Sequence, residues 1–352
     1  MRAITYTVTG DPAVLQLVDR ASVEPGDGEV RVRVVVSGVN PTDWKSRRGT
    51  GPGQPLPFDE VVPNQDGAGV VDALGPGVDG VRVGERVWLL LAAHQRPTGT
   101  AQELVVLPAG RVVPLPDGAG FELGASLGVP AVTAHRCLTV AEDGPRRLHP
   151  GALEGHTVLV AGGAGAVGHA AIQLARWAGA RVVSTVSGPG KGALATAAGA
   201  HHVVDYTTAD SADAIRAVAP DGVDLVVEVA PAQNSELNTA VIATRASIAV
   251  YANNGGDQVV LDVRANMVRN TRYQFVLLYT LGQQALDGAV ADVSAAVSAG
   301  ALPVGDDAGL PLHRFPLERT ADAHAAVEAG VTGKVLVEVG HAAVGHAAVG
   351  TE

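Results

Sequence analysis

Short runs of alternating apolar and polar residues, separated by glycine and proline, fill the first third of the chain. The run at 29–37 (EVRVRVVVS) alternates and is rich in valine, as is typical of a strand with one buried face. Similar runs occupy 67–74, 86–91 and 101–107. Because turn residues rather than helical stretches separate these runs, the pattern predicts an all-β, barrel-like domain.

From Thr157 onward, short apolar runs alternate with stretches of helical period. The predicted strands are 157–161, 181–186, 202–205, 224–229, 246–252 and 274–279. The predicted helices are 166–178, 191–198, 210–218, 235–243 and 284–299. Near-continuous apolar strands separated by helices predict a parallel sheet covered on both faces, as in the doubly wound Rossmann fold.

The rhythm changes again after Pro303, with a predicted helix at 317–329 and a predicted strand at 334–339. We expect these elements to return to the first domain. The predicted division is therefore 1–126, rejoined by 301–352, around a nucleotide-binding domain at 127–300. Residues 340–352 repeat GHAAV and are broken by glycine, which favours a flexible tail.

Composition narrows the class of protein. The 352 residues are 47% hydrophobic, which excludes wholesale disorder, and the net charge of −11 argues against nucleic-acid or anionic-membrane partners. Cys137 is the single cysteine, so neither an intrachain disulfide nor a thiolate-rich zinc site can form. No apolar run approaches membrane-spanning length, and MRAITYTV does not read as a secretory signal, so we expect a cytoplasmic protein without a membrane span.

The strongest chemical signal is a glycine-rich turn between the strand TVLVA and the helix that follows it. Its residues are Gly162, Gly163, Ala164, Gly165, Ala166, Val167 and Gly168. At this place Gly162 permits a tight turn, Gly165 lets the backbone approach a pyrophosphate, and Gly168 lets the helix pack on the strand. Helix N–H groups would then hold the phosphates of a dinucleotide.

The second strand bears on the choice of cofactor. Residues 169–204 contain no Asp or Glu to bind the ribose 2′-hydroxyl of NAD. Ser184 and Ser187 lie at the end of that strand, and Lys191 follows, which suits the 2′-phosphate of NADPH. The alternative for Lys191 is an ordinary solvated surface lysine.

Several segments together resemble the medium-chain dehydrogenase/reductase superfamily, in its zinc-free quinone oxidoreductase (zeta-crystallin-like) branch. They include GVNPTDWKSRRG (38–49), the stretch from VLVAGGAGAVG to VVSTV (158–186), and GKVLVEV (333–339). The resemblance extends over roughly 1–339. It implies a GroES-like β-barrel catalytic domain, a Rossmann NADPH-binding domain, and a homodimer in which the sixth strand pairs across subunits.

The resemblance also implies roles for individual residues. Lys191 and Tyr206 match positions that bracket the 2′-phosphate, Thr133 lies near the nicotinamide, and Asn40 lies beside the nicotinamide ribose and the substrate. Further cofactor positions are Ala230 after the fourth strand, Asn253 after the fifth, Leu277 in the sixth, and Lys334 in GKVLV. The family's usual Asp-x-x-Gly at the fourth strand is replaced by Glu228-Val229-Ala230-Pro231, which departs from the pattern.

Zinc-dependent relatives carry metal ligands at positions that read here Asn40, Gln65, Asp66 and Val129. Of these only Asp66 is a plausible ligand, so we predict no metal in the site. Lys45 stands where some quinone reductases have a pocket tyrosine, with surface pairing to Asp43 as the alternative. The unusual segment 90–98 offers His94 and Gln95 as pocket residues, with a plain loop histidine as the alternative.

These observations predict NADPH-dependent, zinc-independent reduction of a small electrophile, a quinone or an α,β-unsaturated carbonyl compound. Negative charge that develops on the carbonyl oxygen needs a donor, for which Asn40 and Lys45 are weak candidates. No residue is predicted as the proton donor. The alternatives are an enoyl-thioester or natural-product enoyl reductase, a non-catalytic NADPH-binding protein of the crystallin or sensor kind, and, least favoured, a zinc alcohol dehydrogenase.

Overall fold

The computed structural model describes residues 1–340, which divide into two compact units. The first comprises Met1–Pro114, Arg314–Glu328 and the chain from Leu336, and the second comprises Leu115–His313 and Ala329–Val335. This division differs from the predicted boundaries at 126/127 and 300/301. Residues 303–308 group with the second unit because Gln173 donates to Pro303 O at 2.9 Å and the His169 ring contacts Ala308 O at 2.8 Å. The predicted tail lies, apart from Gly340, outside the described residues.

The second unit contains a six-stranded sheet in the order β10-β9-β8-β11-β12-β13. Its strands are β8 (Thr157–Ala161), β9 (Arg181–Val186), β10 (His202–Asp205), β11 (Val223–Glu228), β12 (Ile242–Val250) and β13 (Arg272–Phe275). Every neighbouring pair is parallel. The chain therefore starts in the middle of the sheet, builds one edge and then crosses to build the other, which confirms the doubly wound parallel sheet.

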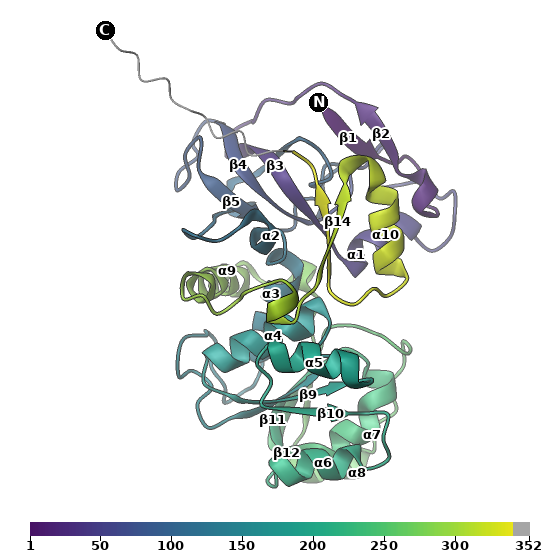
Figure 1. Ribbon diagram of the computed structural model, residues 1–352, viewed down its shortest axis with the longest axis vertical. Helices are drawn as coiled ribbons and strands as arrows, with labels where there is room; N and C mark the ends of the chain where they lie inside the picture. Colours follow the sequence, from purple (N-terminus) through teal and green to yellow (C-terminus); the bar gives the residue numbers. More distant parts are fainter. Residues whose placement is uncertain (341–352) are drawn as a thin grey trace. The chain divides into compact units, whose positions relative to one another are not determined.

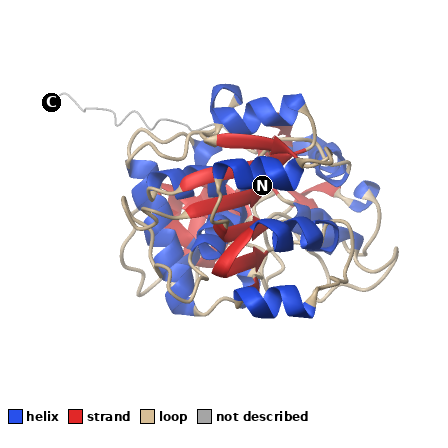
Figure 2. Cartoon of the chain, turned by 90° about the horizontal axis from the view of Figure 1, so that it is seen from below, coloured by secondary structure: helices blue, strands red, loops and turns tan. Residues whose placement is uncertain are grey.

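Helices alternate with these strands and cover the sheet. They are α2 (Phe121–Gly124), α3 (Gly128–Leu138), α4 (Ala166–Trp177), α5 (Pro189–Ala197), α6 (Ser211–Val218), α7 (Pro231–Val241), α8 (Val263–Arg269) and α9 (Gln283–Ser298). Buried side chains such as Leu159, Val183 and Ile248 form part of the core. The strands read as continuous apolar runs because both of their faces are covered. Figure 2 shows helices (blue) bordering the strands (red).

The first unit is built on antiparallel strands. A seven-stranded sheet has the order β14-β15-β3-β4-β5-β7, with β6 also paired to β3, and β1 pairs with β2 separately. The strands are β1 (Arg2–Thr5), β2 (Gln16–Asp19), β3 (Glu29–Val39), β4 (Asp66–Leu74), β5 (Arg86–Leu89), β6 (Leu104–Pro108), β7 (Val112–Pro114), β14 (Leu312–Pro316) and β15 (Lys334–Glu338). The end of the chain thus contributes two strands to a sheet begun by the N-terminal third.

Two helices belong to the first unit, α1 (Pro41–Arg48) and α10 (Thr320–Glu328). They pack against each other although they are far apart in sequence (Figure 1). The buried guanidinium of Arg47 pairs with Glu328 at 2.5 Å and donates to Gly10 O at 2.9 Å. The helix α1 was not predicted, because the segment is short and strongly polar.

The sixth predicted strand, 274–279, is wrong at its C-terminal end. The strand β13 ends at Phe275, and Leu278–Thr280 forms a 3₁₀ turn. Val276 N–H still donates to Val250 O at 2.7 Å, but β12 ends at Val250, so no parallel neighbour continues beyond it. Within residues 1–340, no helix is both long enough and apolar enough to cross a membrane.

Candidate active site

The glycine-rich turn joins β8 to α4 in the second unit. Gly162 has a φ of 71°, and its N–H donates to Thr185 O on β9 at 2.9 Å. Gly165 N–H donates back to Gly162 O at 3.0 Å and Gly165 is the N-cap of α4. A left-handed backbone at the end of the strand therefore turns the chain directly into the helix, as the sequence predicts.

The space around each glycine shows whether internal packing requires a residue without a side chain. A Cβ at Gly163 would lie 2.0 Å from Ser184 Oγ, and one at Gly168 would lie 2.3 Å from Gly162 O, so packing inside the unit requires both glycines. A Cβ at Gly165 would meet nothing closer than Gly162 O at 3.5 Å. Internal packing therefore does not require Gly165. Its bare backbone beside the first N–H groups of α4 fits close approach by a pyrophosphate.

The end of β9 carries the residues predicted to select the cofactor. Ser184 is fully buried and donates through Oγ to Val160 O at 3.1 Å, so its hydroxyl is used inside the sheet. Lys191, at the exposed start of α5, donates through Nζ to Ser187 Oγ at 3.1 Å. The structure thus brings Ser187 and Lys191 together, one ammonium and one hydroxyl at the surface.

Asp205 fixes the backbone of this turn. One carboxylate oxygen accepts Gly188 N–H at 3.0 Å, and the other accepts the Thr207 hydroxyl at 2.7 Å and its N–H at 3.0 Å. The Thr207 bonds, followed by Gly188, lower the pKa of Asp205. Both oxygens of the Asp205 carboxylate therefore accept hydrogen bonds within the turn. Tyr206 follows with its side chain 41% exposed.

The other candidate cofactor residues of the second unit occupy varied environments. Thr133 is buried on α3, and Leu277 is 56% exposed just beyond β13. Asn253 donates to Asp257, and Lys334 is buried at the start of β15. No ligand contact tests these assignments, so they stay predictions.

The departure at the fourth strand has a structural explanation. Glu228, fully buried at the end of β11, accepts Ala230 N–H at 2.6 Å and the side-chain amides of Asn234 and Asn238 at 2.9 and 2.6 Å. A carboxylate at the head of α7 is favourable, because helix N–H groups and the helix dipole attract negative charge. Pro231 is the first residue of α7, where a missing N–H costs nothing.

Asn40 is the central candidate of the first unit. It follows β3, precedes α1, and is buried. Its Nδ2 donates to Asp66 Oδ2 at 2.7 Å, and its backbone N–H donates to Asp43 Oδ2 at 2.7 Å. Asp43 Oδ1 also accepts Gln65 N–H at 3.1 Å. From the sequence, Asp66 is only a plausible metal ligand; in the structure it is the partner that orients the Asn40 amide.

Lys45 is exposed on α1, and its Nζ lies 5.9 Å from the centroid of the Trp44 ring. Asp43, the partner in the alternative of surface pairing, is buried and accepts backbone N–H groups through both oxygens. Asp43 is the third residue of α1, and its buried side chain caps the start of that helix. This capping role was not recognised from the sequence.

The segment predicted to line the pocket is a strained loop. Leu91 and Gln95 have φ values of 55° and 56°. Arg111 holds the loop by donating to Leu91 O at 2.8 Å and His94 O at 2.9 Å. Burial first, and then the charge of Arg111, lower the pKa of His94. His94 is half-buried and Gln95 is exposed.

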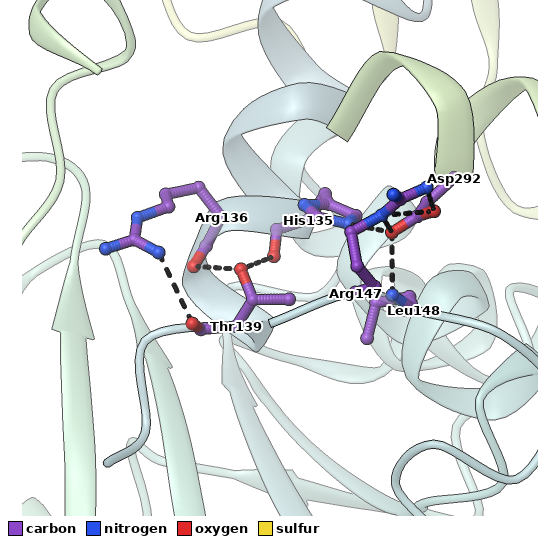
Figure 3. A network of polar contacts seen from close by, with 6 residues as sticks. All are labelled: His135, Arg136, Thr139, Arg147, Leu148 and Asp292. Carbon is purple, nitrogen blue, oxygen red and sulfur yellow. Dashed lines mark hydrogen bonds and ion pairs between the residues drawn. The ribbon is translucent and has the colours of Figure 1, made fainter. Parts of the chain in front are cut away.

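The role of one further buried carboxylate, Asp292, was not predicted. In the second unit, Asp292 of α9 contacts the His135 ring at 2.8 Å and accepts Leu148 N–H at 2.7 Å and the Arg147 guanidinium at 2.5 Å (Figure 3). Burial would raise the pKa of Asp292, but the bonds from His135, Arg147 and Leu148 outweigh it and hold the pKa well below its usual value. This cluster ties α3 and the 147–148 loop to α9.

The donor set does not fit zinc. Asn40 and Gln65 offer neutral amides, Val129 offers none, and the Asp66 carboxylate already binds the Asn40 amide. Throughout residues 1–340, no group of three or more His, Cys, Asp or Glu side chains is placed to hold a metal ion.

Parts of both units match known protein families. A family model described as alcohol dehydrogenase GroES-like domain matches residues 26–117, and one described as zinc-binding dehydrogenase matches residues 166–295. Human quinone oxidoreductase is 28% identical over 344 residues, covering 96% of this chain and 97% of that protein.

Two solved structures extend the comparison. An NAD-dependent alcohol dehydrogenase superposes with a TM-score of 0.82 at 28% identity, covering 97% of this chain and 100% of that one. A mycobacterial protein in complex with NADPH gives 0.78 at 29%, covering 96% and 99%. These likenesses support a nicotinamide dinucleotide in the family without choosing between NAD and NADP.

Proposed function

Because the chain belongs to the medium-chain dehydrogenase/reductase superfamily, in its quinone oxidoreductase branch, we propose that it is an NADPH-dependent reductase of quinones or α,β-unsaturated carbonyl compounds that works without a metal. The observation that carries the proposal is the pairing of Ser187 with Lys191 beside a glycine turn suited to a pyrophosphate. A bound NADPH supplies a hydride.

The cofactor preference rests on charge. The Lys191 ammonium compensates the charge of a 2′-phosphate, and the Ser187 hydroxyl adds a hydrogen bond. NAD would require a carboxylate facing its ribose. Asp205, the first acid after the glycine turn, is held instead by Gly188 and Thr207. NADPH is therefore favoured over NADH.

On the substrate side, Asn40 is the proposed donor to the carbonyl oxygen. Its Nδ2 carries two hydrogens, and the Asp66 carboxylate fixes the amide plane. Hydride addition to a conjugated system places negative charge on that oxygen, where a pre-oriented N–H stabilises it. Such a substrate is already electrophilic, so no Lewis acid is required, in keeping with a donor set that does not fit zinc. Lys45, His94 and Gln95 remain proposed pocket residues.

Initial rates of NADPH and NADH oxidation with ortho- and para-quinones, 2-alkenals, cyclic enones and a crotonyl thioester test the proposal. We expect turnover with NADPH well above NADH. Lys191→Ala should raise the KM for NADPH about tenfold and leave that for NADH unchanged. Thr196→Ala, on the exposed face of the same helix, is the matched control.

Each other outcome supports a different function. Equal rates with both nucleotides would contradict the cofactor proposal. Turnover of the thioester alone would favour an enoyl-thioester reductase. Tight NADPH binding with no turnover of any acceptor would favour a non-catalytic binding protein.

We also propose a homodimer formed through the edge of the six-stranded sheet. Exposed apolar side chains gather on α8, β13 and the segments around them, including Val260, Met267, Val268 and Phe275. An edge strand with exposed apolar neighbours invites pairing. Light scattering after size exclusion should give a dimer mass, and Phe275→Glu should shift it toward a monomer.

A further inference from the structure

A row of buried polar side chains continues from Asp66 into the first unit. The Thr100 hydroxyl lies 2.6 Å from Asp66 O and 2.7 Å from Ser37 Oγ. Asn64 Nδ2 donates to Ser37 Oγ at 2.9 Å, and His324 Nε2 lies 2.8 Å from Asn64 Oδ1. All of these side chains are buried. They come from β3, the loop before β4, the segment before β6, and α10.

Every hydrogen bond in this row is donated in the same direction, from His324 towards Asp66. Thr100 has a single hydroxyl hydrogen and gives it to Asp66 O, so Ser37 must donate to Thr100. Asn64 donates its amide to Ser37, so its Oδ1 must accept from His324. His324 is therefore the Nε2–H tautomer. Burial, and then the charge of Arg47, lower its pKa to about 3, so the ring is neutral.

The middle of the row is conformationally strained. Asn64 has a φ of 79°, which is uncommon for a residue other than glycine. Its carbonyl accepts Thr100 N–H at 3.0 Å, and a Cβ at the neighbouring Gly99 would lie 2.3 Å from that oxygen. Such a conformation persists only where surrounding contacts determine it, and it clusters at functional sites.

We propose that His324 is a positioning residue for Asn40, acting through Asn64, Ser37 and Thr100 on Asp66. The row fixes the main chain at Asp66, and the carboxylate of Asp66 fixes the Asn40 amide. A helix near the end of the chain thereby sets the geometry of a donor that lies in its first part. This inference rests on the proposed function of Asn40.

Ser37→Ala breaks the row in the middle by removing one oxygen. We expect kcat with the best acceptor to fall about tenfold, because a small displacement of a donor is costly in catalysis. The KM for NADPH should change less than twofold. His324→Leu should have a similar effect, and His324→Gln, which can place a donor near the former Nε2, should restore most of the rate. Thr320→Val removes a buried hydroxyl of α10 that donates to Leu317 O and is the folding-matched control.

A double-mutant cycle separates positioning from general loss of structure. In an Asn40→Ala background, Ser37→Ala should have no further effect on kcat. Full additivity of the two losses, or an equal loss in Thr320→Val, would overturn the inference while leaving the proposed function intact. A wild-type protein that turns over no acceptor would overturn the proposed function itself. Circular dichroism melting of each variant confirms that the rates belong to folded protein.

Discussion

Two buried carboxylates, Asp292 in the second unit and Asp66 in the first, are satisfied in different ways. Asp292 receives a guanidinium, an imidazole and a backbone N–H. Asp66 receives the neutral amide of Asn40 on its carboxylate and the hydroxyl of Thr100 on its main-chain oxygen. The cluster around Asp292 joins helices, whereas the row through Asp66 ends at a candidate donor.

This difference in hydrogen-bond partners indicates whether each group mainly affects stability or the orientation of a side chain. The Asp292 carboxylate contributes to folding because it is the shared acceptor of a buried imidazole and a buried backbone N–H, and its loss leaves both without a good partner. A neutral row contributes less to stability but specifies the orientation of each member, because hydrogen bonds are directional. We therefore expect substitutions at Asp292 to change stability and substitutions at Asp66 to change turnover.

Asp292→Asn should have the largest effect. Loss of the charge leaves the buried His135 ring and the Leu148 N–H with a weaker acceptor, and we expect the free energy of unfolding to fall by about 3 kcal/mol. Denaturant titration measures the change. Asp287→Asn, on the exposed side of the same helix, is the control and should change stability by less than about 0.5 kcal/mol.

Asp66→Asn should lower kcat about tenfold, equal to about 1.4 kcal/mol, with a smaller effect on unfolding. The asparagine keeps the volume but weakens the acceptor for Asn40 Nδ2. Asp72→Asn on the same strand, which removes the pair with Arg31 at 2.7 Å, should affect stability and not rate. The comparison of the two carboxylates is contradicted if Asp66→Asn keeps full turnover.

Acid should selectively weaken the Asp292 cluster. The folded-state pKa of Asp292 is lowered, so its contribution is complete above the unfolded pKa of about 3.9 and disappears as pH falls through the lower folded value. The difference in Tm between wild type and Asp292→Asn should therefore shrink from about pH 5 toward pH 2. A difference that stays constant with pH would show that the carboxylate charge is not its cause.

Arg147→Ala should have the smallest effect. Its side chain is 56% exposed, so water screens much of the attraction to Asp292. We expect a loss of about 1 kcal/mol or less in unfolding free energy, reduced further by salt. A loss as large as that of Asp292→Asn would mean that the guanidinium, rather than the buried imidazole and backbone N–H, dominates the cluster.

The second unit was largely predictable from the sequence. The strands predicted at 157–161, 181–186 and 202–205 coincide with β8, β9 and β10. Gly162 and Gly168 have the predicted turn and packing functions. Prediction failed beyond Phe275, where an apolar run continues but the neighbouring strand has ended. The end of a strand depends on its hydrogen-bonding neighbour, which local pattern does not contain.

The first unit was less predictable. Asn40 and Asp66 lie far apart in the sequence, and nothing in the sequence around either residue indicates that the Asn40 amide binds the Asp66 carboxylate. His324 lies on a helix near the end of the chain and contacts Asn64 across the fold. At Ser184, local position was a poor guide. Its place at the end of β9 suggested a contact with the cofactor, but its hydroxyl donates to Val160 O inside the sheet.

The sequence by itself therefore determined the fold class, the order of strands and helices in the second unit, and the glycine turn, because these depend on hydrophobic period and on backbone conformations that only glycine adopts readily. The tertiary structure alone decided which side chains from distant segments share a hydrogen bond: Asn40 with Asp66, and His324 with Asn64. Hydrogen bonds act over about 3 Å and need alignment, so they follow from the packing of distant segments rather than from spacing along the chain.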